Sequence, residues 1–527
     1  MVESRSLPPE RVAAFLEYAC PDARVIGPGA RRSAQNAAMR ILTRHPDIAR
    51  DSLYTAVVCG DLEEVQRILS VRPDAASENG GPKGWPPLLY LCNARLPLAT
   101  ARDNPSTLRE PQGRPEQGRG TTSSGQAPVA IARALLDRGA DPNSYYVLRG
   151  VEDYHYTALT CVLGRGEEVA TLHPDAEALA RLLLERGAEP YDTQLLYNVF
   201  ADNTSRPLLG DDIIWLLELI YTHSVQRGRQ ADWNDPTWSM LDMGGGRPAA
   251  RYLLEAAVEG NHLELAQWFL THGASPNALS WPGSRLTHTL HEEALRRGFT
   301  EMADLLLRFG ATPGVVRLDD RETFEAACVR LDRHAAQAIL ERHPEYLHDP
   351  GPMMTAARLD RLDVAALLLD LGMSPDVSDT GGARALHMAA GANALRVTRL
   401  LVERGAEIDF RDPAYDATPF GWAVHYDQPR TIEYLRRISR DVFNLAGTGH
   451  VERLRQVLSA EPERAKEMHW GVTPLFCLPD DEQRAMEVVE LFLACGTDTA
   501  IRNRAGLTAE ECARKEGFEE VAARLQF

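Results

Sequence analysis

The sequence predicts an all-α fold, a solenoid of stacked helix pairs joined by short loops and hairpin fingers. Two observations predict it: one phrase recurs along the chain, and its copies keep a regular spacing, which is the signature of a repeat architecture. The phrase is two or three aliphatic residues, two mostly polar residues and then Gly-Ala, often followed by Asp-Pro or an equivalent pair. Its copies begin at Leu135, Leu183, Phe269, Leu306, Leu368, Leu401 and Phe492.

The spacing of the copies gives the length of the repeat. Gly310 and His343 are 33 residues apart, and so are Gly372 and Gly405. A segment of this length holds two short antiparallel helices and a loop, and neither helix can bury its apolar face without a neighbouring repeat. We expect the glycine after each second helix in the left-handed conformation that ends helices. Four further copies lack this glycine and continue with Pro-Asp or Pro-Glu; they begin at Ile41, Ile68, Ile339 and Val457.

The first helices complete the pattern. The most regular one reads Arg384-Ala-Leu-His-Met-Ala-Ala390, at the place where ankyrin repeats have T-P-L-H-x-A-A. Further openings of this kind are Thr418-Pro-Phe-Gly-Trp-Ala423 and Thr473-Pro-Leu475. The chain therefore resembles the ankyrin-repeat family across most of residues 30–527, with about 13 degenerate repeats. The resemblance implies that His387 hydrogen-bonds backbone within its repeat, and that loop tips and first helices form the binding surface.

The domain organisation follows the repeats and their interruptions. Residues 93–127 are rich in Pro, Gly, Arg, Ser and Thr, so we expect a disordered insert there. A second insert carries Trp233 and Trp238, which either fold back on the array or meet a partner, and Gly244–Gly246, which we interpret as a hinge. The predicted segments are N-terminal capping helices with a degenerate first repeat (1–50), repeats (51–223), the second insert (224–250), repeats (251–505) and a polar C-terminal capping repeat (506–527).

Composition and charge exclude several classes of protein. The 527 residues are 44% hydrophobic and 25% charged, as in ordinary globular proteins. Acidic residues outnumber Lys and Arg by 75 to 57, a net charge of −18, which argues against nucleic-acid and membrane binding. Eight cysteines without a CxxC pair predict neither a disulfide framework nor a zinc cage. With no visible signal peptide and a strong excess of Arg over Lys, we expect a cytoplasmic protein from a bacterium.

Motifs for chemistry are missing from the sequence. No metalloprotease, nucleophile-elbow, kinase or EF-hand signature occurs. His288, His291, Glu292 and Glu293 invite a metal site, but we interpret them as solvated polar residues at the start of a helix. Asp319–Asp320 and Asp480–Glu482 fit helix N-termini, where the helix dipole favours carboxylates. We therefore predict no enzyme activity and no catalytic, cofactor-binding or metal-binding residues.

The function that remains is a non-enzymatic scaffold that binds a protein partner, with a mild preference for a basic surface. Large aromatic residues in the loops after second helices are the candidate anchors, because Tyr and Trp are enriched at binding hot spots. Two alternatives stay open: an enzyme or ligand-binding protein whose site is formed by the inserts, and a secreted effector that binds a host protein. The candidate partner-binding residues are Tyr145, Tyr146, Tyr154, Trp281, Tyr415 and Trp470.

Overall fold

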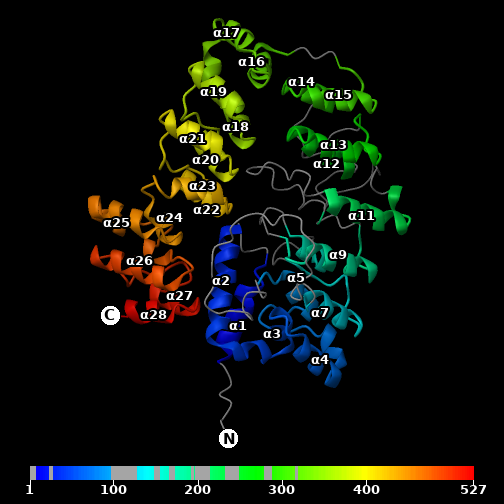
Figure 1. The fold of residues 1–527 in the computed structure, drawn as a ribbon, viewed down its shortest axis with the longest axis vertical. Helices are drawn as coiled ribbons and strands as arrows, with labels where there is room; N and C mark the ends of the chain where they lie inside the picture. Colours follow the sequence, from blue (N-terminus) through cyan, green and yellow to red (C-terminus); the bar gives the residue numbers. More distant parts are fainter. Residues whose placement is uncertain are drawn as a thin grey trace, which may run out of the picture. The chain divides into compact units, whose positions relative to one another are not determined.

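The computed structural model describes residues 8–22, 28–96, 127–147, 155–164, 172–190, 195, 214–231, 249–277, 288–314 and 318–526. Two compact units make up the chain. Unit 1 contains residues 1–195 and 465–527, and unit 2 contains residues 196–464, so the chain leaves unit 1 and later returns to it. The predicted all-α class is confirmed, since helices dominate both units (Figure 1). Among the described helices, none is long and apolar enough to cross a membrane.

Unit 1 consists of helix pairs drawn from both ends of the chain. Its first helices are followed by second helices that end where the recurring phrase predicts. The pairs are α1 (Pro9–Ala19) with α2 (Pro28–Arg44), α3 (Leu53–Val58) with α4 (Leu62–Val71), α5 (Pro87–Asn93) with α7 (Ala127–Leu136), α8 (Ala158–Leu163) with α9 (Ala176–Glu185), η7 (Pro474–Phe476) with α26 (Glu482–Ala494), and α27 (Ala509–Lys515) with α28 (Glu519–Leu525). The predicted disordered insert, apart from residues 93–96 and Ala127, lies outside the described residues.

Unit 2 continues the same pattern, and its first helices α18, α20 and α22 lie side by side (Figure 1). It opens with α11 (Ile214–Gln226), which extends past the predicted boundary at residue 223. Trp233, Trp238 and the glycine triplet lie outside the described residues. The pairs are α12 (Ala249–Glu259) with α13 (Leu263–Thr271), α14 (Leu290–Arg296) with α15 (Thr300–Arg308), α16 (Asp320–Val329) with α17 (Arg333–Leu340), α18 (Gly351–Arg358) with α19 (Leu362–Asp370), α20 (Ala385–Gly391) with α21 (Leu395–Glu403), α22 (Pro419–His425) with α23 (Pro429–Leu435), and α24 (Val442–Gly447) with α25 (Val451–Ala460).

Short polar side chains start these helices. Thr418 is the N-cap of α22 and accepts a hydrogen bond from the Gly421 amide at 3.0 Å. Asp319 caps α16 in the same way, in a reciprocal capping box with Glu322. These caps satisfy amide groups that a helix start leaves without a partner, and each contributes about 1 kcal/mol. The predicted placement of Asp319 at a helix N-terminus is confirmed.

Helix ends follow two different rules. Where the phrase contains glycine, the residue after the second helix is left-handed, as at Gly405 with φ of 90°. Where glycine is replaced, the chain instead enters a proline-initiated 3-10 turn, because proline fixes the φ that the first position of such a turn needs. These turns are η1 (Pro46–Arg50), η2 (Pro73–Ser77), η5 (Pro344–His348) and η6 (Pro462–Lys466).

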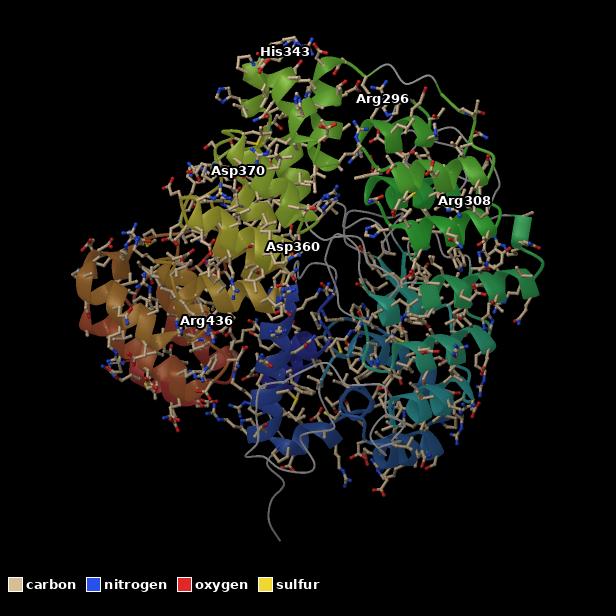
Figure 2. The ribbon with its side chains drawn as sticks, turned by 45° about the horizontal axis from the view of Figure 1, so that its top comes forward. Arg296, Arg308, His343, Asp360, Asp370 and Arg436 are labelled. Carbon is tan, nitrogen blue, oxygen red and sulfur yellow. The ribbon has the colours of Figure 1, made fainter. Side chains whose placement is uncertain are left out.

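Repeats in unit 2 are joined by a shared core and by polar contacts at their edges. Leu401 on α21 is completely buried in a cluster that runs from Phe324 to Ala406. At the edge, Asp370, labelled in Figure 2, accepts hydrogen bonds from Arg333 and Arg404, each at 3.0 Å, and so links three successive repeats. All three of these side chains are exposed, so the core contributes most of the stability.

One of the predicted hairpin fingers is a two-stranded sheet in unit 1. Strand β1 (Tyr145–Val147) pairs antiparallel with β2 (His155–Thr157), and Tyr146 lies opposite Tyr156. Since successive side chains in a strand point to opposite faces, Tyr146 and Tyr156 are buried while Tyr145 and His155 are exposed.

Candidate interaction surface

The loop before α22 is organised by one buried carboxylate. Asp412 is 1% exposed, and its Oδ1 accepts hydrogen bonds from the amides of Ala414 at 3.1 Å and Tyr415 at 2.8 Å. Its Oδ2 accepts from the Ala417 amide at 3.3 Å and from the indole Nε1 of Trp422 at 3.0 Å. A single side chain thus fixes both the loop backbone and the orientation of an aromatic ring on the following helix.

Three aromatic side chains form a continuous surface beside this carboxylate. Trp422 lies between Tyr415, with ring centroids 6.1 Å apart, and Tyr426, with centroids 6.2 Å apart, in edge-to-face geometry. Tyr415 is 61% exposed, while Trp422 and Tyr426 are half-buried. We call Tyr415, Trp422 and Tyr426 the aromatic surface.

Helix α20, beneath the aromatic surface, has a glycine where the rings pack against it. A Cβ atom placed on Gly391 of α20 would lie 3.2 Å from atoms of both Trp422 and Tyr426. The absence of a side chain at this position therefore lets the two rings rest directly on α20. Any larger residue would have to push the rings outward.

His387 supports the same loop from inside the repeat. Its Nδ1 accepts a hydrogen bond from the Arg384 amide at 3.1 Å, and its Nε2 faces the carbonyl oxygens of Phe410 at 3.1 Å and Ala417 at 3.2 Å. The predicted backbone-bonding role of His387 is confirmed. Burial lowers the pKa of this imidazole below its ordinary value, so the neutral form is favoured.

The structure places the predicted partner-binding residues in different environments. Tyr145 is 50% exposed and stacks on His155, with ring centroids 4.1 Å apart. Trp470 is 55% exposed at a loop tip, where the Arg504 guanidinium lies 5.3 Å from its ring centroid. Tyr154 and Trp281 lie outside the described residues. Of the described candidates, only Tyr415 belongs to the aromatic surface.

Tyr146 needs a correction as a surface anchor. It is only 9% exposed, because its ring stacks between Trp85, with centroids 4.5 Å apart, and Tyr156, with centroids 5.0 Å apart. The hairpin register directs this side chain into unit 1. Tyr146 therefore stabilises the finger and is not available to a partner.

Trp422 and Tyr426 were not singled out from the sequence. Both lie on a first helix, which the family resemblance identifies as part of the binding surface. Trp422 follows the position that corresponds to His387, and Tyr426 lies at the end of the helix. Large aromatic residues at these outward positions of a first helix were the signal that could have found them.

The polar group at the start of α14 is structural, but it is not solvated as predicted. His291 and Glu293 are each 5% exposed. Thr289 and Glu292 form a capping box, while Glu293 pairs with Arg297 and with His288. Burial disfavours ionisation of Glu293, yet Arg297 and His288 outweigh it and lower its pKa. Within the described residues, no group of three or more His, Cys, Asp or Glu side chains is arranged to hold a metal ion.

Part of the chain matches a known protein family. A family model described as ankyrin repeats in three copies matches residues 324–412 and 353–444, the region that contains the aromatic surface. Residues 324–444 are thus similar to ankyrin repeats. This agrees with the resemblance seen in its first helices and recurring phrase.

Related ankyrin proteins match parts of the chain. An ankyrin repeat protein of Fowlpox virus (strain NVSL) is 28% identical over 153 residues, which is 29% of this chain and 22% of the viral protein. The ankyrin repeat protein YahD of Escherichia coli (strain K12) is 25% identical over 191 residues, 33% of this chain and 94% of that protein. The chain thus spans less than a quarter of the viral relative and nearly all of YahD.

Solved structures of ankyrin domains also match parts of the chain. One is an ankyrin repeat domain from Acinetobacter baumannii, with 21% identity and a TM-score of 0.26, covering 33% of this chain and 96% of that domain. Another is the ankyrin repeat domain of Bcl-3, a member of the IkappaB family, with 16% identity and a TM-score of 0.27, covering 38% and 97%.

Proposed function

We propose that this chain is a non-enzymatic ankyrin-repeat scaffold that binds a protein partner through the aromatic surface. Ankyrin repeats are in general protein-interaction modules, and the family is typically non-enzymatic. The observation that carries the proposal is the group of Tyr415, Trp422 and Tyr426, which presents three adjacent rings at one place on unit 2. Trp and Tyr are the residue types most enriched at binding hot spots.

The rings are also held in place before any partner arrives. Asp412 fixes the Trp422 indole and the backbone of Tyr415, and Gly391 lets the rings lie against α20. An interface that is already ordered loses less conformational entropy on binding, so more of its contact energy becomes affinity. This rigidity favours a role in recognition over a role in filling the core.

The partner is proposed to present basic residues. Aromatic ring faces attract cations, and an Arg or Lys above a Trp or Tyr contributes about 0.5–2 kcal/mol. The chain's net charge of −18 adds long-range attraction for a basic surface. We propose that the interaction takes place in the cytoplasm, as expected from the sequence.

Affinity capture followed by direct binding measurements tests this function. The protein is immobilised, the bound partner is identified by mass spectrometry, and Kd is measured with a variant carrying Tyr415→Ala and Trp422→Leu. We expect binding to weaken by about 2 kcal/mol or more, roughly 30-fold in Kd, with helical content unchanged.

The matched control is Phe309→Ala, because Phe309 is also an exposed aromatic residue of unit 2 but lies outside the aromatic surface. Its binding should match that of the wild type. Equal affinity of the double variant and the wild type for every captured partner would refute the aromatic surface as the binding site.

A further inference from the structure

Helix α2 carries a polar stripe that faces the last repeats of the chain. Asn36, Arg40 and Arg44 are four residues apart, so they lie on one face of the helix. The amide of Asn36 donates to Asp480 Oδ2 at 2.6 Å. Residues 444 positions apart in sequence are thus brought together inside unit 1.

The two arginines of the stripe cap the end of α27. Arg40 donates from Nε to the Glu516 carbonyl at 3.1 Å, and Arg44 donates to the Gly517 carbonyl. These carbonyls follow the last turn of the helix, where no further turn can supply a donor. Arginine side chains near a helix C-terminus satisfy such carbonyls and interact favourably with the helix dipole.

Carboxylates and an aromatic ring complete the contact. Arg40 Nη1 donates to the Asp480 carbonyl at 3.0 Å, and Arg44 pairs with Glu482. The Arg40 guanidinium also lies 3.7 Å from the ring centroid of Phe518, which is 1% exposed. A Cβ on Gly517 would lie 3.2 Å from Ile41, so the two segments are in close packing.

Helix α1 extends the same contact with weaker ion pairs. Arg11 Nη2 lies 3.6 Å from Glu519, and Lys515 lies 3.9 Å from Glu17. We call all contacts of α1 and α2 with residues 480–519 the terminal seam. Several polar groups of the C-terminal repeat are therefore in contact with side chains of α1 and α2.

We propose that helices α1 and α2 are an intramolecular cap for the C-terminal repeat, and that the terminal seam is an ionic latch whose opening exposes that repeat. In a repeat array each repeat is stabilised by its neighbours, and here α1 and α2 contact the repeat that contains α27 and α28 through charged and polar side chains. Because arginine contacts predominate, salt weakens the latch more than it weakens the apolar core. The latch joins the two segments of unit 1, residues 1–195 and 465–527, which are separated in the sequence by unit 2.

Hydrogen exchange on the full-length protein tests the latch. The variant Arg40→Ala/Arg44→Ala removes the two capping side chains, including the guanidinium that lies on the Phe518 ring, and leaves every residue of α27 and α28 unchanged. We expect amide exchange in residues 509–525 and 28–44 to accelerate at least about threefold, because local opening of these segments no longer breaks the contacts of the two arginines. Residues 385–403 of unit 2 serve as the internal reference and should not change.

The matched control is Arg524→Ala, which breaks the pair with Glu490 inside the C-terminal repeats without touching α2. It should leave exchange in residues 28–44 unchanged. Raising NaCl from about 0.05 to 0.5 M should speed exchange at 509–525 in the wild type more than in the double variant. Unchanged exchange at 509–525 in the double variant, or equal acceleration at 385–403, would overturn the proposal.

Discussion

At the scale of single residues, the turn between the two helices of a repeat requires a left-handed backbone. Glycine, asparagine or aspartate fills this position in most repeats, as at Gly298, Asn393 and Asp360. Asn393 and Asp360 also accept amide hydrogen bonds from the second helix of the next repeat. Leu331 occupies the same position with φ of 61° and is 43% exposed. It therefore has the strained left-handed backbone, but its side chain cannot accept the hydrogen bond that Asn393 and Asp360 accept.

Replacing Leu331 by Asn should therefore stabilise unit 2. A left-handed conformation costs a residue with an ordinary side chain about 1–2 kcal/mol, and Asn tolerates it better. We expect the free energy of unfolding to rise by about 1 kcal/mol, measured by urea denaturation. As a control, Asn393→Leu should lower stability, since it adds the strain and removes the link to α23. No gain from Leu331→Asn would show that the turn is relaxed despite its φ.

The buried imidazole of His387 predicts a pH dependence. Burial lowers its pKa in the folded state, so between pH 6.5 and that lowered value the unfolded chain binds more protons. The stability that this histidine contributes is therefore complete above about pH 6.5 and is lost as the pH falls below it. His387→Leu should be less stable than the wild type at pH 7.5 by about 1–3 kcal/mol, because it leaves buried backbone groups without partners.

The difference in stability between the wild type and the His387→Leu variant should narrow at pH 5.5. At that pH the unfolded wild-type chain gains a proton that the buried ring resists, and this cost is absent from a variant with leucine at the same position. Urea unfolding at both pH values measures the difference. A gap that stays constant would mean that His387 does not change its protonation between the folded and unfolded states.

At the scale of elements, local sequence predicted most of what the structure shows. The aliphatic pair and its following glycine placed the second helices, as at Leu401 and Gly405, because both signals act within a few residues. Side-chain direction in the hairpin was not predicted, because the inward position of Tyr146 depends on the strand register. The sequence of residues 143–156 has no regular alternation of polar and apolar residues that would indicate this register. Exposure of Tyr415 could be expected, since its loop tip contains no core position.

Contacts between distant elements could not be predicted in this way. The terminal seam pairs Arg40 with Asp480, and nothing within either segment specifies the other. No local pattern distinguishes Arg40 and Arg44 from the many other arginines of the sequence. The aromatic surface depends likewise on Gly391 from one repeat and Trp422 from the next, so neither residue alone reveals it.

At the scale of the whole molecule, stability is distributed along the repeats. Each helix pair packs mainly on its neighbours, as α20 does on α18, α21 and α22. In such an array the free energy is approximately a sum of repeat terms and interface terms between neighbours, so damage remains near its origin. The boundary between the two units is a place at which the extent of destabilisation can be measured.

The variant Leu401→Ala measures how far destabilisation extends along the repeats. Leu401 is completely buried in the core cluster of unit 2, so truncation should cost about 2–5 kcal/mol through lost burial and an unfilled cavity. The matched control is Leu400→Ala, since Leu400 is the adjacent leucine and only partly buried, and its truncation should cost less. In Leu401→Ala, hydrogen exchange should accelerate across residues 362–403 and much less at Leu69 in unit 1, because the opening free energy of each segment depends on its own contacts. Equal acceleration at Leu69 and Leu401 would show instead that the two units unfold as one cooperative body.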